Sequence, residues 1–177
     1  MSVYEPREDS YLILKQVSKF AKGKVLDMGT GSGVLAIEAA KYADEVLAVD
    51  INVEAVNKLH TRIKKEKLKN IKSIQSDLFE NVDGKYDLIT FNPPYLPNDP
   101  EVKDIALDGG PEGYEVIERF LKKAREHMGK DGKILLLFSS LSKKEQIHKI
   151  LKELKYSYEQ VTNLPLDFEI LYVYVIK

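Results

Sequence analysis

The chain has 177 residues, 44% hydrophobic and 31% charged, which is the composition of a globular protein with a sizeable core. Its formal net charge of −1 lacks the basic excess of a dedicated nucleic-acid-binding protein. The absence of cysteine excludes disulfides and thiolate-ligated metal sites, and the histidines show no metal-ligand spacing. We therefore expect one domain over residues 1–177, with no metal, no membrane span and a cytoplasmic location.

Helix-like and strand-like segments alternate along the chain. Residues 1–22 form an N-terminal cap segment and a helix over about 10–21. Strands are then predicted over 24–27, 45–50, 71–75, 86–91, 133–139, 157–162 and 169–176. Helices are predicted over 34–42, 53–67 and 114–128, the last stopped by Gly129, and another opens at the capping-box pattern Ser142-Lys143-Lys144-Glu145.

This alternation indicates an α/β fold with a mostly parallel sheet covered by helices on both faces. The last two strands are joined by a connection too short for a parallel crossover, so one of them should run antiparallel. The basic run over residues 62–69 is interpreted as a solvated helix end, although contact with RNA or an acidic partner is the alternative.

A glycine-rich turn, Asp27-Met28-Gly29-Thr30-Gly31-Ser32-Gly33, follows the first strand. Alternating glycines permit a tight turn at a helix start and close approach of a ligand, so we expect Gly29 and Gly31 to contact a cofactor. The spacing differs from the G-x-G-x-x-G of dinucleotide folds, and no lysine completes a phosphate loop. A nicotinamide cofactor is therefore disfavoured.

Acidic residues end the next two strands. Asp50 can accept hydrogen bonds from both hydroxyls of a ribose, while Asp77 can accept from an adenine amine and Leu78 can lie against the ring. Each acid alone would more often be an ordinary turn residue. Together with Asp27 beside the glycine turn, they favour a nucleoside that carries a cationic tail, which describes S-adenosylmethionine.

The fourth strand ends in Asn92-Pro93-Pro94-Tyr95 and therefore points to the same edge of the sheet. The Asn92 side-chain oxygen and the Pro93 carbonyl can accept the two hydrogens of a planar amino group and aim its nitrogen at a methyl carbon. Pro94 biases Pro93 to an extended conformation, and Tyr95 offers a flat face for stacking. We assign catalysis to Asn92, Pro93 and Tyr95, and substrate binding to all four residues. A proline strand terminator or a polyproline ligand is the alternative.

The glycine turn and NPPY resemble those of S-adenosylmethionine-dependent amino-methyltransferases. With Tyr4-Glu5-Pro6-x-Glu8-Asp9-Ser10 and Gly109-Gly110-x-x-Gly113, the chain resembles the HemK-like N5-glutamine methyltransferases of class I translation termination factors, in their archaeal and eukaryotic form. The resemblance implies a Rossmann-like class I methyltransferase fold with seven strands, the last antiparallel. Bacterial members carry an extra N-terminal helical domain, which we do not expect here.

The resemblance also implies roles for particular residues and partners. Residues expected to contact the cofactor are Ser10, Asp27, Gly29, Asp50, Asp77 and Leu78, while Asn92 and Pro93 hold the target amide. The implied substrate is the glutamine of a Gly-Gly-Gln loop in a class I release factor. Eukaryotic relatives work with a small zinc-binding activator subunit that extends the sheet, and strand 71–75 is its expected contact.

Two other functions stay open. Methyltransferases acting on exocyclic amines of adenine or guanine also carry NPPY, but they usually bring a basic groove or a target-recognition domain; some relatives methylate protein lysine. A binding module without activity would be indicated by degenerate glycines or a lost Asn92, and both are intact.

Overall fold

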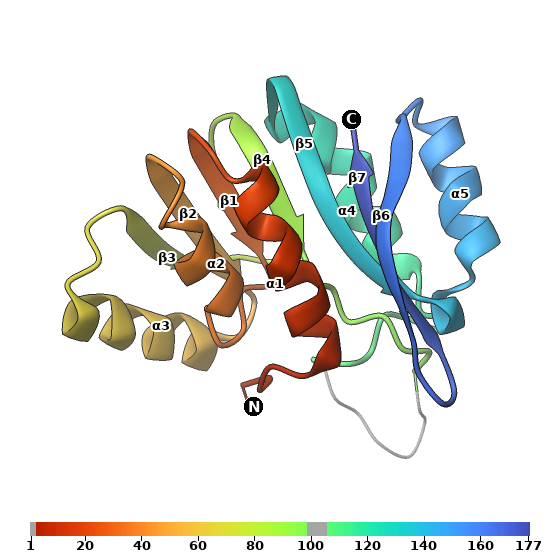
Figure 1. Cartoon of the computed structure of the whole chain (residues 1–177), viewed down its shortest axis with the longest axis horizontal. Coiled ribbons are helices and arrows are strands. Elements are labelled where there is room, and N and C mark those ends of the chain that lie inside the picture. Colours follow the sequence, from red (N-terminus) through yellow and green to blue (C-terminus); the bar gives the residue numbers. More distant parts are fainter. Residues whose placement is uncertain (1–2, 99–105) are drawn as a thin grey trace.

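A single seven-stranded sheet organises the protein (Figure 1), in a computed structural model that describes residues 3–98 and 106–177. The strand order is β3-β2-β1-β4-β5-β7-β6. The first five strands of this order, β3, β2, β1, β4 and β5, pair in parallel with their neighbours, whereas β7 runs antiparallel to both β5 and β6. The strands are β1 (Lys24–Met28), β2 (Glu45–Asp50), β3 (Ile71–Gln75), β4 (Tyr86–Phe91), β5 (Met128–Ser139), β6 (Tyr158–Pro165) and β7 (Ile170–Ile176). The predicted mixed sheet with an antiparallel last strand is confirmed.

Helices cover both faces of the sheet, because each has one apolar side. One face carries α1 (Glu8–Phe20), α2 (Val34–Ala39) and α3 (Val53–Glu66), and the other carries α4 (Glu115–Ala124) and α5 (Lys144–Glu153). On the second face, Phe120 of α4 contacts Phe91 of β4 with ring centroids 4.5 Å apart. This contact places the last residue of β4 firmly in the core.

The parallel strands all end at one edge, which is the lower edge in Figure 1. The described N-terminal segment and the hairpin between β6 and β7 also reach this edge. Residues 1 and 2 of the expected cap segment lie outside the described residues. Ligands of such sheets bind beyond the carboxyl ends of the strands, so this edge is where a site is expected.

The predicted helix over residues 114–128, with Gly129 as its stop, is wrong at its end. Helix α4 ends at Ala124, a 3-10 turn η1 (Arg125–His127) follows, and Gly129 lies in β5. Strand β5 begins early because Met128 pairs with Tyr86 ahead of a register shift. The polar stretch at 130–132 gave no apolar alternation by which this pairing could be predicted.

The predicted capping box at Ser142 is also wrong. Helix α5 begins at Lys144, and its N-cap Lys143 has φ +53 and no side-chain capping bond. A capping box instead joins Ser139 and Ser142 around the 3-10 turn η2 (Ser140–Ser142). Ser142 is engaged elsewhere, because its hydroxyl donates to the Tyr95 carbonyl at 2.8 Å.

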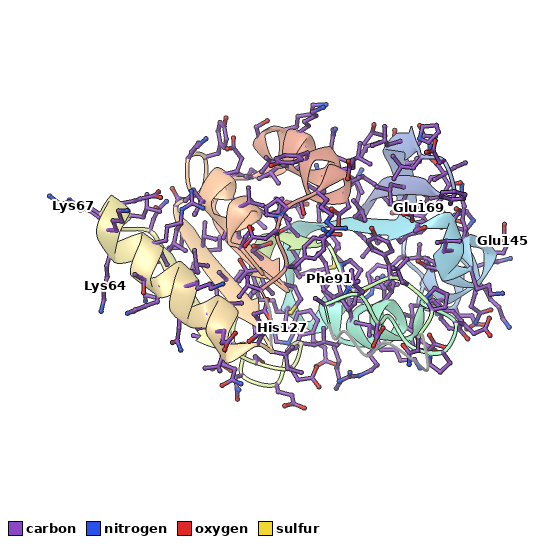
Figure 2. All side chains as sticks on the ribbon, turned by 90° about the horizontal axis from the view of Figure 1, so that it is seen from below. Lys64, Lys67, Phe91, His127, Glu145 and Glu169 are labelled. Atoms are coloured by element: carbon purple, nitrogen blue, oxygen red, sulfur yellow. The ribbon has the colours of Figure 1, made fainter. Side chains whose placement is uncertain are left out.

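The basic run at the end of α3 lies away from the centre of the carboxyl edge. Figure 2 looks onto this edge and shows Lys64 and Lys67 at the far end of α3, well away from Phe91 at the centre. This basic run is exposed, as a solvated helix end would be. Among the described residues, no helix combines the length and apolar character that crossing a membrane requires.

Candidate functional site

A cavity of about 620 Å³ opens at the carboxyl edge of the sheet, a size typical of small-molecule sites. It brings together nearly all of the site residues predicted from the sequence, from four strand ends and the N-terminal segment. They are Ser10, Gly29, Gly31, Asp50, Asp77, Leu78, Asn92, Pro93, Pro94 and Tyr95. Asp27 is the exception, because it does not line the cavity.

The glycine turn is held against β2 by Asp50. The Asp50 carboxylate accepts the Gly31 N–H at 2.8 Å and the Asn52 N–H at 2.8 Å. Gly31 has φ +51, a left-handed conformation that glycine adopts without strain. Burial raises the pKa of Asp50 above its ordinary value, although the backbone hydrogen bonds partly offset this. Each carboxylate oxygen can accept a further hydrogen bond, so Asp50 can also receive ribose hydroxyls.

Asp27 lies beneath the turn and is fully buried. It accepts hydrogen bonds from the Thr30 hydroxyl and the Thr90 hydroxyl, both at 2.6 Å. Thr30 belongs to the glycine turn, and Thr90 lies in β4 two residues before Asn92. Burial raises the pKa of Asp27 from 3.8 to about 6, against the lowering effect of these bonds. Asp27 therefore braces the turn against the strand that carries NPPY.

The end of β3 contributes an acid and an unusual backbone conformation. Asp77 forms an ion pair with Arg119 of α4, with Nη2 2.8 Å from Oδ2. Leu78 has φ +47, which is strained for a residue with a side chain. Such strain gathers at functional sites, where the fold holds a residue in place for contact with a ligand.

Asn92 follows the end of β4 and lines the cavity. Its Nδ2 donates to Asp9 Oδ2 at 2.9 Å and lies 3.5 Å from the Ser10 hydroxyl oxygen. Its Oδ1 is buried and has no hydrogen-bond partner within the described parts of the chain. A buried acceptor without a donor is costly, which makes this oxygen a site where a ligand N–H would be favoured.

The NPPY loop packs closely against the backbone of the segment that contains Gly109 and Gly113. A Cβ at Gly113, where φ is +83, would lie 2.7 Å from the Tyr95 carbonyl oxygen. A Cβ at Gly109 would lie 2.8 Å from the Pro94 carbonyl oxygen. The glycines noted in the sequence are thus needed for close packing of two loops, and together with the Ser142 hydroxyl they hold the loop rigidly.

Tyr95 keeps its proton in this setting. Burial, and then the charges of Asp9 and Glu169, raise the pKa of Tyr95 far above its ordinary value. Figure 2 shows Glu169 on the β6–β7 side of Phe91. A neutral phenol suits a stacking wall or a hydrogen-bond donor, and it does not suit a base.

Several residues that line the cavity were not predicted as site residues from the sequence. Tyr4 and Asp9 had been quoted only as parts of a motif, and no local pattern marks Arg119 as a cavity residue. Ile51 lines the cavity beside Asp50 and is 47% exposed, so its position directly after the strand-end acid could have indicated it. Over residues 3–98 and 106–177, no cluster of three or more His, Asp or Glu side chains could hold a metal ion.

The methyltransferase small domain family model matches residues 5–171 of the chain. The chain belongs to this family. A Methanocaldococcus jannaschii protein with the provisional name protein N5-glutamine methyltransferase is 43% identical over 97% of this chain and 89% of its own length. The release factor glutamine methyltransferase of Deinococcus radiodurans is 34% identical over 71% of the chain, and the ribosomal protein uL3 glutamine methyltransferase of Francisella tularensis is 32% identical over 63%.

This small-domain methyltransferase spans 49% and 40% of those two bacterial relatives. Among solved structures, it is similar to Mtq2 of E. cuniculi, with a TM-score of 0.81 and 25% identity over 100% of this chain and 99% of that one. The Mtq2 structure is a complex with Trm112 that is responsible for methylation of the eRF1 translation termination factor. The predicted enzyme class and fold are therefore confirmed.

Proposed function

We propose that this enzyme transfers the methyl group of S-adenosylmethionine to the side-chain amide nitrogen of a glutamine, in the Gly-Gly-Gln loop of a class I release factor. The observation that carries the proposal is the buried Oδ1 of the cavity-lining residue Asn92, which accepts no hydrogen bond from any described residue. Two relatives support it: the Methanocaldococcus jannaschii protein, matched over 89% of its length, is named for N5-glutamine, and the E. cuniculi structure, matched over 99% of its length, is a complex responsible for methylation of the eRF1 termination factor.

The residues that line the cavity fit S-adenosylmethionine. Asp50 would bind the ribose, Asp77 and Leu78 would hold the adenine, and Ser10 with the glycine turn would face the cationic tail. Acids outnumber bases in the cavity lining, which includes Arg119, and this balance suits an ammonium and a sulfonium. Asp27 would act through the turn that it braces. When bound, the cofactor supplies an electrophilic methyl carbon.

The residues of the NPPY loop would do the positioning. Asn92 Oδ1 and the Pro93 carbonyl each accept one hydrogen of the glutamine amide, which turns its nitrogen lone pair toward the methyl carbon. Tyr95 provides the flat wall beside the amide plane. A bound cofactor would supply the methyl group and keep the electron pair on its sulfur, and the glutamine nitrogen would give up one proton to water, so the loop residues need to position the amide and no strong base is required.

The first test is methyl transfer from labelled S-adenosylmethionine to a purified class I release factor. Label should appear with the intact Gly-Gly-Gln loop and be absent when its glutamine is replaced by alanine. Ribosomal protein uL3 serves as a second acceptor, because the Francisella tularensis relative is named for it. Label on uL3 alone, or on nucleic acid alone, would contradict the proposed substrate.

Asn92→Ala tests the role of the amide. Turnover should fall by about 100-fold or more, since the aligning acceptor is lost, while cofactor affinity stays within a few-fold. Calorimetric titration with S-adenosylmethionine measures the affinity separately from the rate. A loss of affinity as large as the loss of rate would contradict the assignment.

The Trm112 complex of the similar Mtq2 supports an activator subunit for this chain as well. Strand β3 is an edge of the sheet, and no described strand pairs with the backbone groups on its outer side. The Asn70 carbonyl and the Ser76 N–H bond inward to β2, so the backbone of Ser73 points outward by alternation. We propose that a Trm112-like subunit pairs here.

Ser73→Pro should abolish co-purification of such a subunit, because proline removes the outward N–H. Lys72→Ala is the matched control, since it changes an exposed side chain and leaves the backbone intact. Charged substitutions at Ile71 would be a poor test, because Ile71 is only 5% exposed and packs in the core. Undiminished co-purification of the proline variant would refute the pairing.

A further inference from the structure

A buried acid from the N-terminal segment faces the NPPY loop. Asp9, in the first turn of α1, is only 4% exposed. Its Oδ2 accepts hydrogen bonds from the Tyr4 hydroxyl at 3.0 Å and from Asn92 Nδ2 at 2.9 Å. Its Oδ1 accepts the Ser10 N–H at 2.6 Å. Each oxygen of the carboxylate therefore has a donor.

This arrangement decides which end of the Asn92 amide faces the cavity. An asparagine side chain can turn over, and the nitrogen and oxygen then exchange places at little steric cost. The Ser10 hydroxyl can donate or accept, so it does not distinguish the two orientations. A carboxylate only accepts, so Asp9 holds Nδ2 on its own side and leaves Oδ1 on the opposite side of the Asn92 amide, without a partner among the described residues.

We infer that Asp9 is a positioning residue, which locks the Asn92 side chain with its oxygen toward the methyl acceptor. This inference rests on the function proposed for Asn92. With the opposite orientation, Asn92 would present two N–H donors to an amide that also offers N–H donors, and the acceptor would not be held. The N-terminal segment is thus part of the catalytic arrangement, although 83 residues separate Asp9 from Asn92.

The first variant is Asp9→Ala, with Glu8→Ala as a matched control that removes an exposed acid from the same turn. Asp9→Ala should lower kcat by about 10-fold to 100-fold, because Asn92 then samples both orientations, with the affinity for S-adenosylmethionine within about threefold. Glu8→Ala should keep kcat near wild type. Thermal melting establishes that both variants are folded.

Exchanging the residues at positions 9 and 92 distinguishes a positioning role of Asp9 from a purely structural one, because only a positioning role predicts recovery of kcat in the double variant. Asn92→Asp alone sets two carboxylates against each other, and Asp9→Asn alone lets an amide nitrogen face the Asn92 nitrogen. In the double variant, the amide at position 9 donates one N–H to the carboxylate at position 92 and one to the Tyr4 oxygen, and its own oxygen accepts the Ser10 N–H. An oxygen at position 92 then faces the cavity again.

We expect the double variant to recover at least about tenfold in kcat over Asn92→Asp alone. A folded, cofactor-binding double variant that is no better than Asn92→Asp would overturn the inference, as would Asp9→Ala with kcat within about twofold of wild type. Wild-type transfer to glutamine is measured in the same series. Its absence would defeat the proposed function itself, whereas its presence with unaffected variants would defeat only the role of Asp9.

Discussion

Replacing Asp27 with asparagine should change the pH dependence of stability in a defined window. The pKa of Asp27 is raised by burial from 3.8 to about 6 in the folded protein, so the folded state binds more protons than the unfolded state between these values. Stability from this group is therefore fully present below about pH 4 and is lost as pH rises through about 6. At about 1.36 kcal/mol per unit, the loss amounts to about 3 kcal/mol by neutral pH.

An asparagine at this position would keep both hydrogen bonds, because one threonine hydroxyl can donate to its oxygen and the other can accept from its nitrogen. The free energy of unfolding, measured by urea denaturation from about pH 3.5 to 7.5, should fall with pH in the wild type by about 3 kcal/mol more than in Asp27→Asn. Asp50, whose pKa is also raised by burial, titrates in both proteins, so its own contribution largely cancels in the difference; its charge is the smallest of the causes that raise the pKa of Asp27. Parallel pH curves for the two proteins would refute the reasoning that Asp27 carries a desolvated charge at neutral pH.

Three further substitutions test individual parts of the site. Asp50→Ala should weaken S-adenosylmethionine binding by about tenfold or more in calorimetry, because hydrogen bonds to a carboxylate are lost, and kcat at saturating cofactor should change far less. Gly113→Ala should lower both the melting temperature and kcat, because the new Cβ would meet the Tyr95 carbonyl. Gly84→Ala is the control, since Gly84 also has a positive φ, +90, but a Cβ there would have no atom within 4 Å. Arg119→Ala should change stability by less than about 1 kcal/mol, because the Arg119 side chain is 57% exposed in its ion pair with Asp77. The substitution should also tighten cofactor binding, because it removes a cation from the cavity lining. Weaker binding would contradict this electrostatic account.

The sequence by itself determined the layout of the site. Each motif is recognised from neighbouring residues, and the topology of a parallel sheet then brings the motifs to one edge. Alternating strands and helices require a parallel sheet, and the carboxyl ends of parallel strands meet at one edge. The glycine turn, Asp50, Asp77 and NPPY each follow a strand, so their positions in the sequence already placed them together. Each of these segments contributes residues to the cavity lining, although Asp27 and Gly33 of the glycine turn do not line it.

Only the tertiary structure decided how each side chain is used. Asp27 carries the same motif signature as a ligand-binding acid, yet pairing of β1 with β4 puts Thr90 beside it and turns it inward. The early start of β5 at Met128 likewise depends on Tyr86, a partner distant in sequence. The hydrogen bond from Asn92 to Asp9 joins two segments that no local pattern connects. Propensity and periodicity describe neighbours along the chain, whereas these contacts arise when the folded sheet and its covering helices bring distant residues within hydrogen-bonding distance.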